Sequence, residues 1–171
     1  SPLKGGAIVY TAPTGGGKTL VAEILMLRRM ACKPKATILV IVPFLALAVE
    51  KTRYFQDMWE DMYVGVKSFH GNSSDSTILN RDVQVAVCTI EKANGLVTKL
   101  LEDRACGISP DEMPELSMVV IDELHLLADP KRGFILEILL ARLKVAFGES
   151  VQVVGMSATL PNLPQVADWL N

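Results

Sequence analysis

The sequence predicts a single α/β domain in three layers, with a mainly parallel sheet covered by helices on both faces. Half of the 171 residues are hydrophobic but only 6% are aromatic, so the apolar content is aliphatic, as in strands buried on both faces. Short β-branched runs also alternate with longer stretches of helical period, which is the pattern of repeated strand and crossover-helix units. A chain of this length is typical of one domain with a substantial core.

The expected elements follow one another in a regular order. Strands end at turn-forming residues, and in the helices Leu, Ile, Val, Met and Ala recur at three- and four-residue spacing. The expected strands are 7–11, 37–42, 64–69, 83–89, 118–122 and 151–156. The expected helices are 18–30, 45–59, 91–102 and 133–147, with a short one beginning near Asn162. Polar segments 72–76 and 109–115 are expected to be surface loops.

Composition excludes several classes of protein. Seventeen basic and 19 acidic side chains leave a net charge of −2, so the chain has no strongly charged tail. The longest apolar stretch, 38–49, is shorter than the roughly 18 residues of a membrane span and contains Pro43, so no membrane segment is expected. Cys32, Cys88 and Cys106 form no CxxC pair, which favours a reduced, intracellular protein.

The strongest chemical signal is the run Ala-Pro-Thr-Gly-Gly-Gly-Lys-Thr at 12–19, between the first expected strand and the first helix. A bound triphosphate needs backbone N–H groups, a helix N-terminus, a Lys for the outer phosphates and a hydroxyl for Mg²⁺. The candidate nucleotide-binding residues are Thr14, Gly15, Gly16, Gly17, Lys18 and Thr19. The general pattern has Gly where Ala12 stands, and a simple glycine-rich turn is the alternative interpretation.

A second signal is the aliphatic strand that ends in Asp122 and Glu123. Strand-terminal acids lie at the carboxyl edge of a sheet, where open α/β sheets bind ligands. Asp122 would hold Mg²⁺ together with Thr19, and Glu123 would orient and deprotonate the attacking water. Such acids often only cap the next helix, so the interpretation depends on the phosphate loop being present in the same chain.

Three motifs in this order resemble motifs I, II and III of superfamily 2 helicases. They are the phosphate loop at 12–19, Asp-Glu-Leu-His at 122–125, and Ser-Ala-Thr at 157–159. Ala12 then fits, because that superfamily commonly has Ala at this position. The resemblance covers almost the whole chain and implies one RecA-like P-loop domain over residues 1–171, the first of two in such enzymes.

Two further runs refine the resemblance within the superfamily. Arg132-Gly133 and the run Val-Gly-Met-Ser-Ala-Thr-Leu-Pro-Asn-Leu at 154–163 resemble the Ski2-like branch. The run Cys-Thr-Ile-Glu-Lys-Ala-Asn-Gly at 88–95 is most similar to helicases of the polymerase theta and HelQ type. This resemblance implies a nuclear DNA-repair protein that acts on single-stranded DNA, although the Ski2-like branch also includes RNA helicases.

The resemblance also assigns roles to individual residues. Lys18 and Glu123 would be catalytic, with ATP and Mg²⁺ as the ligands. Motif III links the ATP site to strand movement in the family, so His125, Ser157 and Thr159 are coupling candidates. From the residues alone, a single His would be ranked as structural.

Two other segments resemble the nucleic-acid-contacting motifs Ia and Ib, at 43–51 and 89–94. The candidate contacts are Pro43, Thr89, Glu91 and Lys92. A hydroxyl and free N–H groups at a helix N-terminus suit a phosphate, but a buried helix start at 43–51 and a simple Thr89 cap explain the same residues. For Arg132, internal ion pairing beside the neighbouring acids Asp129 and Glu137 is preferred to a nucleic-acid role.

The expected function is that of the ATP-binding half of an ATP-dependent DNA helicase or translocase. Only residues 160–171 follow motif III, so the second RecA-like domain, with its catalytic arginines, is expected to lie outside this chain, which alone would have little activity. An RNA helicase and a non-hydrolytic nucleotide-binding scaffold of a polymerase remain alternatives. Other P-loop kinases, GTPases and transporter ATPases are disfavoured, because no Asn-Lys-x-Asp or Leu-Ser-Gly-Gly motif is found.

Overall fold

The aliphatic runs of the sequence form a six-stranded sheet. The computed structural model describes residues 6–13, 15–69, 79, 82–109 and 112–171. Its strands are β1 (Ile8–Thr11), β2 (Ala36–Val42), β3 (Val66–Phe69), β4 (Val85–Thr89), β5 (Glu115–Asp122) and β6 (Gln152–Ser157). Every residue of β2 is buried, which explains why this strand lacks polar alternation.

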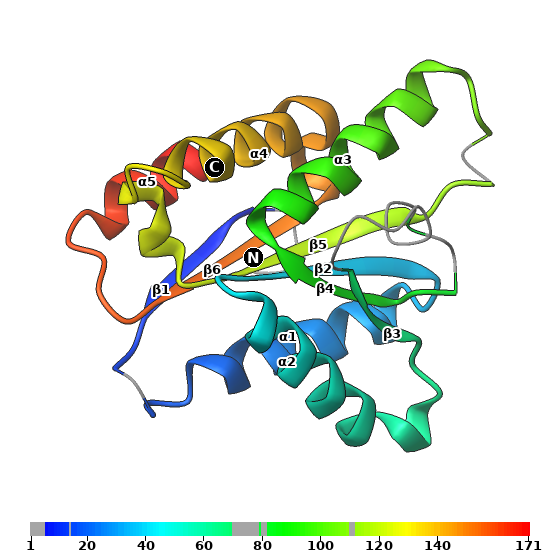
Figure 1. Cartoon of the computed structure of the whole chain (residues 1–171), viewed down its shortest axis with the longest axis horizontal. Helices are drawn as coiled ribbons and strands as arrows, with labels where there is room; N and C mark the ends of the chain where they lie inside the picture. Colours follow the sequence, from blue (N-terminus) through cyan, green and yellow to red (C-terminus); the bar gives the residue numbers. More distant parts are fainter. Residues whose placement is uncertain (1–5, 14, 70–78, 80–81, 110–111) are drawn as a thin grey trace.

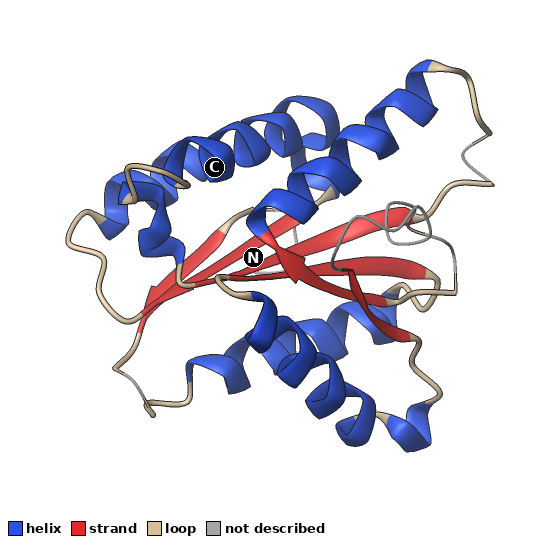
Figure 2. Ribbon diagram, in the orientation of Figure 1, coloured by secondary structure: helices blue, strands red, loops and turns tan. Residues whose placement is uncertain are grey.

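The helices cover both faces of this sheet (Figure 1). They are α1 (Lys18–Cys32), α2 (Leu45–Met58), α3 (Ile90–Ala105), α4 (Gly133–Phe147) and α5 (Leu163–Leu170), with 3₁₀ turns η1 (Glu60–Met62), η3 (Leu124–Ala128) and η4 (Gly148–Ser150). Helices α1 and α2 lie on one face and α3, α4 and α5 on the other, so the structure has three layers (Figure 2). Each face has its own buried aliphatic cluster. None of the helices in the described ranges has the length and apolarity that a bilayer crossing requires.

The strand order is β1-β6-β5-β2-β4-β3, and every described pair is parallel. The predicted three-layer α/β fold class is therefore confirmed. In a parallel sheet, all strands present their carboxyl ends at the same edge, so the loops after β1, β2, β4, β5 and β6 lie along one side of the domain.

Some predicted boundaries were wrong. The third and fourth strands start at Val66 and Val85, two residues later than expected. The Gly65 N–H donates to the side chain of Gln84 at 2.6 Å, and its carbonyl accepts from the Gln84 N–H at 2.9 Å, so this corner is a side-chain-assisted turn. Glu115 was expected in a loop but begins β5, where it forms an ion pair with Lys33. The expected loop at 72–76 lies outside the described residues.

We expect Gly133→Ala to destabilise the fold by about 1–3 kcal/mol, as overpacking in a rigid site does. A Cβ at this position would lie 2.3 Å from the backbone oxygen of Leu127, which cannot move independently. Gly95→Ala is the matched control, because a Cβ there meets nothing within 4 Å and helix interiors favour Ala, so this variant should be slightly stabilised. Urea unfolding of both variants would measure the difference, and equal stabilities would contradict the packing described here.

Candidate active site

The three predicted motifs of the nucleotide site come together because their strands are neighbours. The register pairs Thr11 of β1 with Ser157 of β6, and Met156 of β6 with Asp122 of β5. The phosphate loop, the acidic pair and the Ser-Ala-Thr segment therefore begin side by side at the carboxyl edge. This is the edge at which open α/β sheets bind ligands.

The phosphate loop has the backbone geometry that an anion requires. Gly15 and Gly17 have φ of 79° and 75°, a region that residues with a side chain rarely adopt. The Gly16 N–H donates to the carbonyl of Pro13 at 2.8 Å, which closes the turn. Within the described residues no side chain caps the first turn of α1, so its N–H groups have no side-chain acceptor and can bind an anion. Thr14 lies outside the described residues.

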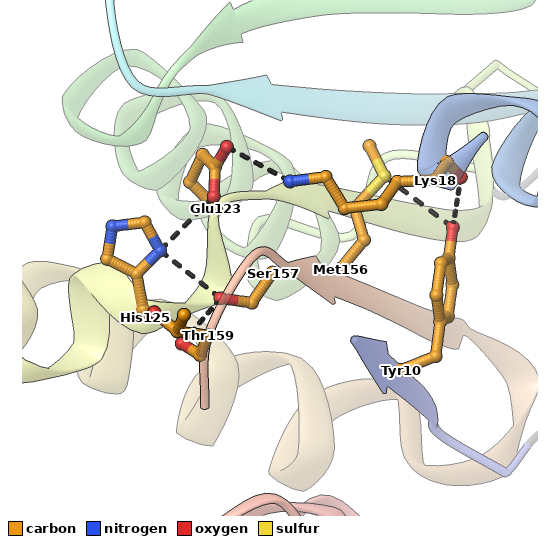
Figure 3. A network of polar contacts seen from close by, with 7 residues as sticks. All are labelled: Tyr10, Lys18, Glu123, His125, Met156, Ser157 and Thr159. Carbon is orange, nitrogen blue, oxygen red and sulfur yellow. Dashed lines mark hydrogen bonds and ion pairs between the residues drawn. The ribbon is translucent and has the colours of Figure 1, made fainter. Parts of the chain in front are cut away.

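Lys18 and Glu123 form an ion pair across the site, with 3.3 Å between Nζ and Oε1 (Figure 3). The Lys18 side chain is only 11% exposed, so this ammonium is largely withdrawn from water. Glu123 has φ 60° and ψ 55°, the left-handed region that costs a residue with a side chain about 1–2 kcal/mol. Such strain at the end of a sheet strand is typical of functional sites, and here it accompanies a carboxylate that faces Lys18.

Glu123 keeps one carboxylate oxygen available. Its Oε2 is buried and accepts no hydrogen bond within the described part of the chain. Nδ1 of His125 lies 3.2 Å from this oxygen and makes an ion pair with it only when the imidazole is protonated. An unpaired buried oxygen is unfavourable by itself, and a bound water that donates to it would relieve that cost.

Asp122 and Thr19 carry oxygen atoms of the hard type that Mg²⁺ prefers. Both line an open groove of about 620 Å³ together with Glu23, Lys51, Tyr54 and Glu123. Burial raises the pKa of Asp122, and the nearby positive charges of Lys51 and Lys18 oppose that shift. The donor set therefore fits a magnesium ion that is held mainly by a triphosphate and its waters, with one carboxylate and one hydroxyl from the protein.

The predicted coupling residues form a hydrogen-bonded cluster beside Glu123 (Figure 3). The Ser157 hydroxyl donates to the carbonyl of Thr159 at 2.9 Å. Nδ1 of His125 lies 3.2 Å from the same hydroxyl oxygen, and because the single hydroxyl proton is already used, the His125 N–H must be the donor. The carbonyl of Ser157 accepts from the Ala12 N–H at 3.2 Å, so this cluster is also attached to the phosphate loop.

Comparison with known proteins identifies the family. The model of the DEAD/DEAH box helicases matches residues 2–166. The chain belongs to this helicase family. It is 42% identical to mouse DNA polymerase theta over 183 residues, which covers 99% of this chain but 7% of that protein. It is 34% identical to the human protein named Helicase POLQ-like, covering 95% of this chain and 14% of that protein.

An archaeal relative extends this group. The chain is 32% identical to the ATP-dependent DNA helicase Hel308 of Aeropyrum pernix, covering 98% of this chain and 21% of that protein. The predicted Ski2-like resemblance is therefore confirmed. A crystal structure described as a hypothetical ATP-dependent RNA helicase from Sulfolobus tokodaii superposes with a TM-score of 0.62 at 22% identity, covering 95% of this chain and 44% of that one. At that identity the similarity supports the fold alone.

In this helicase domain, the two expected nucleic-acid segments also lie side by side. The register pairs Val42 with Thr89, so Pro43 and the start of α3 follow adjacent strands at the carboxyl edge. Thr89 is the extended residue before α3, and its hydroxyl hydrogen-bonds the Glu91 side chain. Lys92 is partly buried in the first turn of α3.

Arg132 forms an internal ion pair, as expected, but its partner is Glu91, 41 positions away, and not one of the acids near it in sequence. The residue nearer in sequence, Asp129, instead accepts from the backbone N–H groups of Lys131 and Arg132, each at 2.8 Å. Burial alone would raise the pKa of Glu91, but hydrogen bonds from Arg132, its own N–H and Thr89 lower that pKa below its usual range.

Sequence reasoning missed Glu23 as a member of this site. Glu23 is 6% exposed, and its Oε1 is buried without a hydrogen bond from any described residue. Desolvation and the neighbouring Glu23 carboxylate raise the pKa of Tyr54 on α2. The signal in the sequence is an acid one helical turn after Thr19, on an otherwise aliphatic segment of α1, but that spacing alone is ambiguous.

Proposed function

We propose that this chain is the ATP-binding half of an ATP-dependent DNA helicase or translocase, in which hydrolysis drives movement on single-stranded DNA. The chain spans about 7–21% of the length of the relatives described above, so the activity belongs to a longer parent protein. One observation carries the proposal: Glu123 lies between Lys18 of the phosphate loop and His125 of the coupling cluster. A carboxylate in that position contacts both the nucleotide site and the residues proposed to couple it to strand movement.

The geometry supports a defined role for each group during hydrolysis. The N–H groups of the loop and of the first turn of α1 bind phosphate oxygens, and Lys18 moves from Glu123 to the outer phosphates. Glu123 is then free to orient a water for attack on the γ-phosphorus and to accept its proton. Mg²⁺ bound at Thr19 and Asp122 would neutralise the charge that develops on the phosphates.

Further groups are proposed to come from outside the chain. A second RecA-like domain of the parent would close over the site and supply arginine side chains that stabilise the transferring phosphoryl group. On the strand side, Pro43, Thr89 and Lys92 would contact phosphate and sugar, which gives affinity without base specificity. The similarity to polymerase theta supports DNA as the strand and the nucleus as the location.

The test is ATP-dependent strand displacement by the full-length protein that carries this chain. The substrates are a duplex with a single-stranded DNA overhang and its RNA counterpart. Displacement of the DNA duplex with ATP, and none with a non-hydrolysable analogue, is expected. Preference for the RNA overhang would favour the alternative RNA helicase, and no displacement with full ATP turnover would favour a translocase.

We expect Ser157→Ala to uncouple the two activities. Its hydroxyl joins His125 to Thr159, so its loss removes one hydrogen bond from each of these partners. The number of ATP molecules consumed per strand displaced should rise by about fivefold or more, because two hydrogen bonds of about 1 kcal/mol each are lost. Ser150→Ala is the matched control, because that hydroxyl donates to the Phe147 carbonyl far from the site. An unchanged ratio in Ser157→Ala would exclude the coupling role.

A further inference from the structure

Arg132 connects the two segments proposed to contact the strand. Its Nε and Nη2 donate to the two carboxylate oxygens of Glu91 at 2.7 and 3.1 Å, and its Nη1 donates to the carbonyl of Pro43 at 2.6 Å. Pro43 follows β2, and Glu91 lies in the first turn of α3, after β4. One guanidinium therefore spans the loops at the carboxyl ends of two adjacent strands.

The backbone of Arg132 is itself held in place. The Asp129 carboxylate accepts from the N–H groups of Lys131 and Arg132, and the Asp129 carbonyl accepts from the N–H of Gly133 at 2.9 Å. A side chain at Gly133 would collide with the Leu127 carbonyl, so the chain passes close to η3 here. Because η3 directly follows Glu123, the backbone of Arg132 is held against the segment that begins at the proposed catalytic base.

The arrangement requires the shape of an arginine. A planar guanidinium can bind a carboxylate with two parallel N–H groups and still direct a third N–H to another acceptor, whereas a single ammonium cannot reproduce this geometry. The pair is not a strong contributor to stability, because the Glu91 side chain is 50% exposed and such pairs are screened by water. Its consequence is therefore mainly geometric.

The pair also removes an electrostatic problem at the start of α3. Glu91 places a carboxylate beside the helix N-terminus where a strand phosphate would bind, and two anions at such a site repel each other. The bidentate contact with Arg132 balances that charge and directs the carboxylate toward the guanidinium. The Thr89 hydroxyl and the Glu91 N–H also bond to this carboxylate, so the other N–H groups of the first turn are the ones that can face a phosphate.

We propose that Arg132 is a positioning residue for nucleic-acid binding, which sets the spacing and charge of the Pro43 loop and the α3 start without contacting the strand. This inference rests on the proposed function of these two segments. Through Arg132, the Pro43 loop and the start of α3 are linked to the turn that follows Glu123 by contacts within this chain.

The experiment measures binding of a fluorescein-labelled single-stranded oligodeoxythymidine to the full-length protein by fluorescence anisotropy. Arg132→Gln should raise the dissociation constant about five- to tenfold, equivalent to one or two lost hydrogen bonds. Two quantities should also be compared in ATPase assays. The strand concentration that gives half-maximal ATP turnover should rise, and the maximal turnover at saturating strand should change less. Arg142→Gln is the matched control, because Arg142 also joins α4 to α3, through Asn94 and Thr98, away from both loops.

Two more variants separate positioning from direct contact. Glu91→Gln removes a negative charge, so if Arg132 bound phosphate directly this variant should bind the strand more tightly. Positioning predicts the opposite, a dissociation constant raised about twofold or more, because a neutral amide in place of the carboxylate cannot hold the guanidinium by two charge-assisted bonds. Arg132→Lys keeps the charge but should not restore wild-type binding.

The outcomes distinguish the inference from the function on which it rests. If the wild-type protein binds the strand but Arg132→Gln resembles Arg142→Gln, or if Glu91→Gln binds more tightly, the positioning role is wrong and the proposed function stands. Wild-type affinity in Arg132→Lys would overturn the geometric argument. If the wild-type protein binds no single strand at all, both the inference and the proposed function fail.

Discussion

Glu123→Gln should lower ATP hydrolysis by the parent protein about 10²–10⁴-fold, the range that a positioned general base contributes. The amide keeps the size of the side chain, but it cannot accept the proton of the attacking water. ATP binding should remain or improve, because Lys18 loses its ion-pair partner and is free to meet phosphate oxygens. Phosphate release at saturating strand and binding of a fluorescent ATP analogue are the two measurements.

The matched control is Glu115→Gln. Glu115 lies at the opposite end of the same strand, β5, where it pairs with Lys33 on the surface. That variant changes the same charge and should hydrolyse ATP at the wild-type rate. If Glu123→Gln also did so, Glu123 would not be the base, and a non-hydrolytic nucleotide-binding scaffold would be the better account of the chain.

Lys18→Ala should weaken nucleotide binding about 100-fold or more, which corresponds to about 2.7 kcal/mol. The loss includes charge-assisted hydrogen bonds to the outer phosphates, each worth about 1.5–3 kcal/mol. It also leaves the Glu123 carboxylate unpaired beside the phosphates, so repulsion adds to the lost attraction. Calorimetric titration of this chain with an ATP analogue and Mg²⁺ would measure the change.

Lys99→Ala provides the comparison for that titration. Lys99 pairs with Asp103 on the exposed face of α3, so its removal changes the net charge equally but leaves the site intact. Its affinity for the analogue should equal that of the wild type. Equal affinity in Lys18→Ala would mean that the nucleotide does not bind at this loop.

Local features of the sequence were sufficient to predict most of the fold and the segments that meet at the candidate nucleotide site. The phosphate loop is one contiguous segment, and Asp122 and Glu123 end a strand whose aliphatic pattern is unmistakable. Parallel strands then bring these segments to one edge by geometry alone. The roles assigned to the individual residues, catalytic, nucleotide-binding, metal-binding, coupling and strand-contacting alike, stay predictions.

Features that depend on pairs distant in sequence could not be predicted in the same way. The partner of Arg132 is Glu91, and no periodicity connects two residues on different helices. The strained backbone of Glu123 and the buried carboxylate of Glu23 are properties of packing. The late start of β3 depends on the contact between Gly65, which precedes β3, and Gln84, which precedes β4.

If the proposed function is right, the nucleotide site in this chain responds to a nucleic-acid strand. The most direct test is the steady-state ATP turnover of the full-length protein with and without single-stranded DNA, at saturating ATP and Mg²⁺. We expect a marked rise in turnover on addition of the strand, and no such rise in Glu123→Gln. Turnover that is the same with and without the strand would contradict the proposed function.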